Sequence, residues 1–135
     1  MTDKALCELA IKAMENAYVP YSGYKVGAAL LCSDGTVFTG CNIENASFSP
    51  TICAERVAFA KAVSENKRIF DAIAVCGGKD GHLTADIFPP CGVCRQVMRE
   101  FCRDDFRVLL IYSDGFKEYR LDELLPASFS PSRLS

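Results

Sequence analysis

Three cysteines in two short motifs constrain this chain most, because each motif stands where a helix is expected to begin. The motifs are Cys53-Ala54-Glu55-Arg56 and Pro90-Cys91-Gly92-Val93-Cys94. A proline is well tolerated at a helix start, and residues three apart share a helix face, so both sulfurs of the second motif can reach one metal ion. Unpaired backbone N–H groups at a helix start also favour thiolate over thiol. Both motifs together therefore indicate two strand-to-helix junctions that meet at one metal site.

The number of cysteine ligands indicates a catalytic metal rather than a structural one. Three thiolates satisfy a zinc ion but leave the fourth tetrahedral position open, whereas structural zinc sites fill all four. Zinc lowers the pKa of water in the open position, so hydroxide exists near neutral pH. Glu55 lies two residues from Cys53 and can take a proton from that water. We therefore expect Cys53, Cys91 and Cys94 to bind Zn²⁺ and Glu55 to be the catalytic residue.

Arg56 is expected to lie next to this metal site. Three thiolates and one Zn²⁺ carry net negative charge, and Arg56 can offset it by donating hydrogen bonds to a cysteine sulfur. The alternative is a solvated surface arginine. Arg95 and Gln96, which follow the second motif, are weaker candidates for the same position.

Other readings of the cysteines stay open. The only histidine, His82, sits in a Gly-rich loop and is expected to be solvated. The remaining cysteines are expected to behave as small buried hydrophobes; they are Cys7, Cys32, Cys41, Cys76 and Cys102. A structural zinc site would need a fourth ligand from among these residues. A redox pair formed by Cys91 and Cys94 is the other alternative.

Size and charge narrow the class of protein. The chain has 135 residues, of which half are hydrophobic, and this length fits one domain over residues 1–135 with a core of its own. Its net charge of -2 gives no general attraction to nucleic acid or anionic membranes. No membrane-length apolar run and no signal-peptide pattern is found. We expect a cytoplasmic protein without nucleic-acid or membrane partners.

Helical and strand patterns alternate along the chain. Helices are expected over residues 2–18, 54–64 and 92–102, and strands over residues 26–31, 36–42, 70–76, 107–112 and 117–121. Residues 77–81 are expected to form a loop, and residues 121–125 a short helical turn. Helices placed between strands indicate a layered α/β domain with a mixed sheet. Ligand sites of such sheets lie at strand-to-helix ends, where both cysteine motifs fall.

The order Cys-x-Glu followed by Pro-Cys-x-x-Cys is typical of zinc deaminases, and the chain resembles the small homotetrameric cytidine deaminases. Residues 21–30 (YSGYKVGAAL), residues 40–46 (GCNIENA) and residues 123–126 (ELLP) also carry the resemblance. It implies a three-layer α/β/α fold with a five-stranded mixed sheet. It also implies a homotetramer with one Zn²⁺ per subunit and active sites at the subunit interfaces.

The resemblance assigns substrate contacts to five residues. Asn42 and Glu44 would bind the ribose hydroxyls, and an amide and a carboxylate suit that task. The backbone of Ala54 would recognise the edge of the base. Tyr24, where the family has Phe, and Val26 would contact the pyrimidine.

Two further aromatic residues match family positions that act between subunits. Phe48 matches an aromatic residue near a neighbouring subunit's site, and Phe129 matches one that reaches into another subunit's pocket. Burial in an ordinary core is the alternative for both side chains.

The implied reaction is hydrolytic deamination of cytidine, and of deoxycytidine, to uridine or deoxyuridine plus ammonia, as in pyrimidine salvage. Zinc-bound hydroxide would attack C4 while Glu55 moves the protons. One alternative is a blasticidin S-type aminopyrimidine nucleoside deaminase, which shares the zinc motifs. A nucleic-acid deaminase is disfavoured because the chain lacks net positive charge. A non-catalytic zinc-binding interaction module is the remaining alternative.

Overall fold

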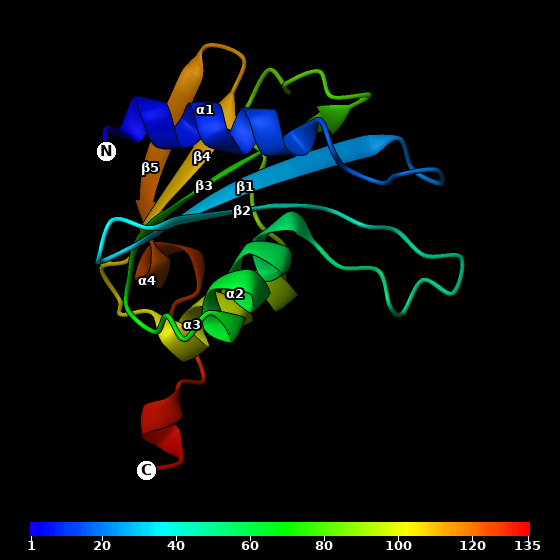
Figure 1. Ribbon diagram of the computed structural model, residues 1–135. Coiled ribbons are helices and arrows are strands. Elements are labelled where there is room, and N and C mark those ends of the chain that lie inside the picture. The colour runs from blue at the N-terminus through cyan, green and yellow to red at the C-terminus, as the bar shows by residue number, and fades with distance from the viewer.

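The computed structural model describes residues 1–135, in which helices cover both faces of one five-stranded sheet (Figure 1). The helices are α1 (Asp3–Met14), α2 (Ala54–Ser64), α3 (Gly92–Phe101) and α4 (Leu121–Leu124), with a 3₁₀ turn at Pro131–Arg133. None of these helices has the length and hydrophobicity that a membrane span requires.

The sheet is mixed, as expected. Its strands are β1 (Tyr24–Cys32), β2 (Val37–Cys41), β3 (Phe70–Lys79), β4 (Arg107–Tyr112) and β5 (Gly115–Arg120), in the order β2-β1-β3-β4-β5. β3 and β4 run parallel, while the other neighbouring pairs are antiparallel. The predicted three-layer α/β/α fold with a five-stranded mixed sheet is confirmed.

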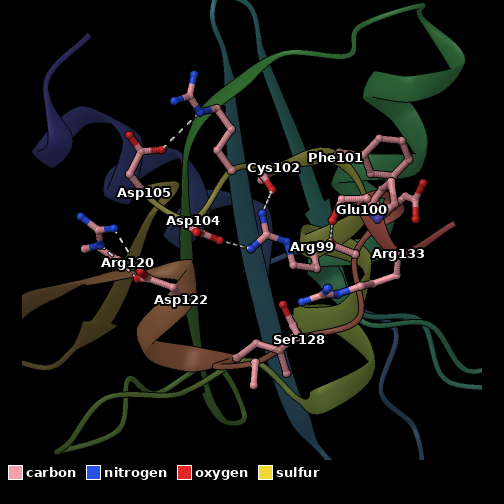
Figure 2. A pocket seen from close by; sticks show the side chains of 16 residues that line it. Arg99, Glu100, Phe101, Cys102, Asp104, Asp105, Arg120, Asp122, Ser128 and Arg133 are labelled. Carbon is pink, nitrogen blue, oxygen red and sulfur yellow. Dashed lines mark hydrogen bonds and ion pairs between the residues drawn. The ribbon is translucent and has the colours of Figure 1, made fainter. Parts of the chain in front are cut away.

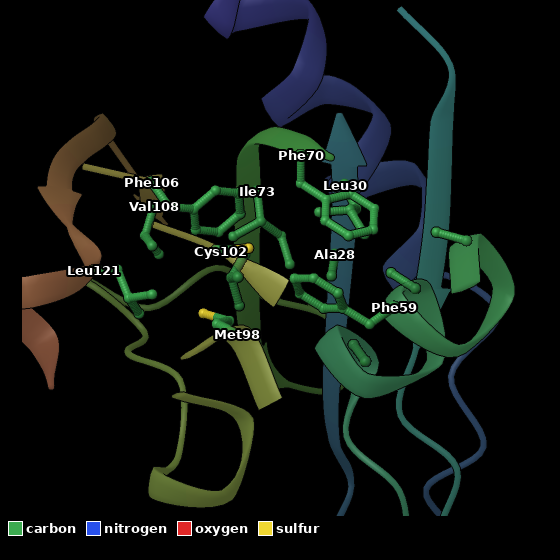
Figure 3. Close-up of a cluster of buried hydrophobic side chains, with 14 of the residues drawn as sticks. Ala28, Leu30, Phe59, Phe70, Ile73, Met98, Cys102, Phe106, Val108 and Leu121 are labelled. Atoms are coloured by element: carbon green, nitrogen blue, oxygen red, sulfur yellow. The ribbon is translucent and has the colours of Figure 1, made fainter. Parts of the chain in front are cut away.

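Two hydrophobic cores lie on opposite faces of the sheet, because successive strand residues point to opposite sides. On β3, Ile73 faces the core shared with α2 and α3, whereas Ala72 and Ala74 face the core shared with α1. Phe59 from α2 and Met98 from α3 pack in the first core (Figure 3). This core fixes the two helices whose first turns carry the cysteine motifs.

α1 is shorter than the helix expected over residues 2–18. Thr2 is its N-cap, and the Thr2 hydroxyl accepts from the backbone N–H of Ala5 at 3.1 Å. The helix ends at Met14 because the backbone of Tyr18 bonds to the segment after β2. The N–H of Tyr18 donates to the carbonyl of Asn42 at 3.0 Å, and the carbonyl of Tyr18 accepts from the N–H of Glu44 at 2.9 Å.

β3 extends beyond the expected strand over residues 70–76 and includes Gly77, Gly78 and Lys79, which were expected in a loop. These residues pair with the first residues of β1, Tyr24–Val26. Glycine is needed at position 78 because a Cβ there would lie 1.6 Å from the carbonyl oxygen of His82. Gly78 therefore allows the following segment to pass close to the strand. The expectation of a loop was wrong for residues 77–79, whereas residues 80 and 81 form a turn.

Candidate functional site

The three predicted metal ligands meet where α2 and α3 begin. Cys53 is the N-cap of α2, Cys91 is the N-cap of α3, and Cys94 lies in the first turn of α3. Neither N-cap sulfur is used to cap its own helix. The three Sγ atoms all lie within 4.8 Å of one another, with 3.8 Å from Cys53 to Cys91 and 3.5 Å from Cys91 to Cys94.

This spacing fits a zinc ion. A Zn–S bond of about 2.3 Å places two sulfurs of a tetrahedral site about 3.8 Å apart. No further His, Cys, Asp or Glu joins the group, so a structural site with four protein ligands does not form here. The Nδ1 atom of His82 lies instead 3.1 Å from the carbonyl oxygen of Lys79. The donor set is therefore three thiols with a fourth position left for a ligand from outside the chain.

Hydrogen bonds within the group favour a thiolate at Cys53. Donation from Cys94 and from Arg56 lowers the pKa of Cys53 to about 5. The same pairing, together with burial, raises the pKa of Cys94. The Nη2 atom of Arg56 lies 3.6 Å from the Sγ atom of Cys53, so the structure places this arginine against a sulfur. Such an electropositive surrounding is typical of cysteines that act as ligands or nucleophiles.

Glu55 is buried next to this group. Its exposed fraction is 3%, it is the one charged residue buried in the chain, and its Oε1 atom has no hydrogen-bond partner. Burial raises the pKa of Glu55 to about 7. A carboxyl group with a free oxygen and a pKa near neutrality can both accept and donate a proton. Ala54, which precedes it, is fully buried at the start of α2.

Asn42 follows β2 and bonds to the start of β1. Its Oδ1 atom accepts from the backbone N–H of Val26 at 2.8 Å, and its Nδ2 atom donates to the carbonyl of Tyr24 at 2.9 Å. One amide hydrogen and one lone pair remain free for a ligand. The predicted substrate contacts Asn42, Tyr24 and Val26 are thus brought together.

Glu44 holds the turn that precedes β1. Its Oε1 atom accepts from the backbone N–H groups of Tyr21 and Ser22 at 2.9 and 3.1 Å, and its Oε2 atom accepts from the Ser22 hydroxyl at 2.5 Å. The hydrogen bond from Ser22 lowers the pKa of Glu44. A surface hollow of about 400 Å³ opens beside this carboxylate; its lining residues are Tyr21, Ser22, Glu44, Asn45, Phe48 and Thr51.

The three aromatic residues predicted for the substrate pocket are exposed. The exposed fractions are 47% for Tyr24, 74% for Phe48 and 59% for Phe129, so neither phenylalanine belongs to a core of this chain. Phe48 has a positive φ of 58° and meets the ring of Tyr21 edge-on, with 6.4 Å between centroids. The carbonyl of Phe129 accepts from Nε2 of Gln96 at 2.8 Å. The structure therefore does not bring Phe129 into the group around Glu44.

Sequence reasoning missed Ser22 and Lys79. The Nζ atom of Lys79 donates to the carbonyl of Ser22 at 2.8 Å and lies 5.4 Å from the centroid of the Tyr24 ring. Neither residue type carries a signal of its own in a turn or at a strand end. Arg95 was considered as a partner of the sulfurs, but it donates to backbone carbonyls, that of Pro90 among them at 2.8 Å.

A surface hollow of about 840 Å³ lies apart from the three grouped cysteines, between the end of α3 and the C-terminal residues (Figure 2). It contains none of the predicted site residues. Four of its charged side chains form ion pairs with one another: Arg99 with Asp104 at 2.5 Å and Arg120 with Asp122 at 3.0 Å. The three grouped thiols and the buried Glu55 lie outside this hollow, so the candidate site is the cysteine group.

Known proteins resemble the chain over nearly its whole length. A family model, the cytidine and deoxycytidylate deaminase zinc-binding region, matches residues 1–110. A cytidine deaminase of Sporosarcina psychrophila is 50% identical over 125 residues, which cover 92% of this chain and 88% of that protein. A cytidine deaminase of Halalkalibacterium halodurans is 50% identical over 131 residues, 96% of each chain.

Solved structures and a more distant relative complete the comparison. The crystal structure of cytidine deaminase from Burkholderia pseudomallei superimposes with a TM-score of 0.88 and 45% identity, covering 96% of this chain and 100% of that chain. A blasticidin-S deaminase of Bacillus cereus is 27% identical over 131 residues, 95% of this chain and 92% of that protein.

Proposed function

The chain belongs to the cytidine and deoxycytidylate deaminase family, and we propose that it is a zinc-dependent enzyme that hydrolyses cytidine to uridine and ammonia. The observation that carries this proposal is the group of three thiols beside the buried carboxyl group of Glu55, whose Oε1 atom has no hydrogen-bond partner. The proposal extends to deoxycytidine and to a place in pyrimidine salvage, on the family resemblance.

Cys53, Cys91 and Cys94 would hold the zinc ion, because their sulfur spacing fits tetrahedral coordination. Arg56 would offset the charge of the thiolates from its position against Cys53. When bound, zinc supplies Lewis-acid activation of a water molecule near neutral pH.

Glu55 would carry out the proton transfers. Its carboxylate takes a proton from the attacking water and delivers it to N3 of the cytosine ring. It then moves the proton of the hydroxyl group added at C4 to the amino group on C4, which leaves as ammonia, and the C4 carbonyl forms. C4 gains one oxygen and loses one nitrogen, so cytidine and water give uridine and ammonia. Burial supports this role, because it raises the pKa of Glu55 to about 7, where the group can both accept and donate a proton near neutral pH.

Asn42 and Glu44 would bind the sugar hydroxyls, and a hollow opens beside Glu44. Asn42 keeps a free amide hydrogen and Glu44 keeps free lone pairs for this purpose. The backbone of Ala54 would bind the base edge, and Tyr24 and Val26 would lie against the pyrimidine.

A homotetramer follows from the family resemblance. The exposure of Phe48 and Phe129 is consistent with it, since both side chains are free to contact a neighbouring subunit. In this assembly the two phenylalanines would complete sites of neighbouring subunits. We also propose a single domain over residues 1–135 and a cytoplasmic location, both on the resemblance.

One assay separates the proposed substrate from the alternatives. Ammonia release is measured with cytidine, deoxycytidine, blasticidin S and a cytosine-containing oligonucleotide, together with the zinc content of the protein. We expect turnover of the two nucleosides. Turnover of blasticidin S alone would indicate a blasticidin S-type deaminase, an alternative that the similarity to the Bacillus cereus protein supports. Zinc-loaded protein that releases no ammonia from any substrate would indicate a non-catalytic zinc module.

A further inference from the structure

Gly40 lies where β2 and α2 touch backbone to backbone. A Cβ atom at Gly40 would stand 2.3 Å from the carbonyl oxygen of Ala54, 2.8 Å from the backbone nitrogen of Ala58 and 3.1 Å from Cβ of Val57. Gly40 has no positive φ, so its backbone conformation does not require glycine. The requirement is therefore one of space, and the atoms that need the space belong to the first turns of α2.

The first turn of α2 also carries two residues of the proposed zinc site. Cys53 is its N-cap and Glu55 is its second residue, on either side of the Ala54 carbonyl that approaches Gly40. Any shift of this carbonyl therefore moves a thiol and a carboxyl group together. The other two thiols, Cys91 and Cys94, belong to α3 and would not follow.

We propose that Gly40 is a positioning residue for the zinc site, which sets how deeply the first turn of α2 lies on the sheet. This proposal rests on the proposed zinc function. An alanine at position 40 requires a displacement of about 1 Å to restore an ordinary contact distance. α2 is the part that yields, because β2 is fixed by pairing with β1 from Gly27↔Cys41 to Leu31↔Val37. Displacements of this size commonly cost about 10- to 100-fold in metal affinity or rate.

Gly27 provides a matched control on the neighbouring strand. A Cβ at Gly27 would stand 2.1 Å from the carbonyl oxygen of Ala10 and 2.7 Å from the backbone nitrogen of Met14, so it is at least as crowded. It faces α1, which covers the opposite face of the sheet from α2 and α3, the helices that carry the grouped cysteines (Figure 1). Gly27→Ala and Gly40→Ala therefore create the same kind of clash, but only the second displaces a helix that carries site residues.

The test compares zinc affinity, by competition with a chromophoric chelator, for the full-length wild type and both variants. We expect Gly40→Ala to raise the zinc dissociation constant about 10- to 100-fold and to lower kcat more than it changes KM. Gly27→Ala is expected to destabilise folding while its zinc dissociation constant stays within about threefold of wild type. Equal zinc affinities in the two variants would overturn the proposal. Absence of zinc binding in the wild type would instead overturn the proposed function itself.

A second measurement covers the case in which Gly40→Ala does not fold at room temperature. A stabilising osmolyte such as sucrose favours the folded chain, and Co²⁺ is then added to it in place of zinc. The visible absorption of Co²⁺ reports its coordination geometry. We expect a spectrum altered from that of the wild type for Gly40→Ala and an unaltered one for Gly27→Ala. A wild-type spectrum for Gly40→Ala, or no refolding at any osmolyte concentration that refolds Gly27→Ala, would contradict a role specific to the site.

Discussion

The Nη2 atom of Arg56 lies 3.6 Å from the Sγ atom of Cys53, one helical turn away on α2. This contact raises the pKa of Arg56 and helps to lower that of Cys53. It places a fixed positive charge beside the thiol group that is to bind a divalent cation. Three thiolates would otherwise over-neutralise a Zn²⁺ ion and weaken it as a Lewis acid.

Replacement of Arg56 tests this charge balance. We expect Arg56→Gln to lower kcat by about 10- to 100-fold, and Arg56→Lys, which keeps the charge, to recover part of the loss. Steady-state kinetics and zinc content are measured together. Arg103→Gln is the control, because the Arg103 side chain is 91% exposed and pairs with Asp105 rather than with a cysteine. If Arg56→Gln were as active as Arg103→Gln, the charge-compensation argument would fail.

Removal of one thiol is expected to remove the metal. Cys91→Ala should purify with little zinc and no activity, because only two of the three grouped sulfurs remain. The control is Cys41→Ala, which replaces a cysteine outside the group and should keep both the zinc and the activity. Metal analysis and thermal unfolding check this, since a metal that binds the folded chain raises its melting temperature. A Cys91→Ala variant with full zinc content would contradict the assignment of ligands.

Ser22→Ala tests the sugar end of the site. The Ser22 hydroxyl donates to Glu44 at 2.5 Å and accepts from the N–H of Tyr24 at 3.0 Å, so it fixes the carboxylate against the turn. Its loss should raise KM for cytidine by about tenfold with little change in kcat, because binding is weakened equally in the ground and transition states. Ser113→Ala is the control on a distant turn. A fall in kcat at constant KM would place Ser22 in the chemical step instead.

An ion-pair network should give the fold a small acid-sensitive contribution. Arg107 contacts Asp3 at 2.5 Å and Glu118 at 2.7 Å, and its hydrogen bond lowers the pKa of Glu118. A carboxyl group with a lowered folded-state pKa stabilises the fold above its unfolded-state pKa, and that contribution is lost as pH falls through the folded-state value. The side chain of Glu118 is 46% exposed, so its ion pair contributes about 1 kcal/mol or less to the free energy of unfolding.

Urea unfolding of wild type and Glu118→Gln measures this contribution. We expect the wild type to be more stable at pH 7 and the difference to be smaller at pH 3, which is below the ordinary range of a glutamate. Glu100→Gln, which removes an exposed carboxylate without an ion pair, should show no such trend. A difference that is the same at both pH values would exclude the electrostatic explanation.

The metal site could be predicted from sequence because its evidence is local. Cys53 and Cys91 each stand at a helix start, and the spacing from Cys91 to Cys94 follows from helix geometry alone. The layered fold could also be predicted, since its helices and strands alternate along the chain. Nothing in the spacing of the motifs required a fourth protein ligand, and the structure supplies none.

The remaining features depend on contacts between distant segments. α1 ends early because the Tyr18 backbone bonds to residues after β2, and β3 continues through Lys79 because it pairs with the first residues of β1. The bond between Ser22 and Glu44 joins residues 22 positions apart. No local pattern in the sequence indicates such contacts, so neither the length of α1 nor the turn held by Glu44 could be predicted.

The most direct test of the account is Glu55→Gln, which keeps the shape of the buried side chain but removes its ability to exchange protons. Zinc content and the rate of uridine formation from cytidine are measured on the same preparation. We predict full zinc occupancy with a fall in kcat of about 100- to 10,000-fold, the range that general acid–base catalysis supplies. A zinc-loaded Glu55→Gln enzyme with near-normal turnover would contradict the central claim that Glu55 moves the protons.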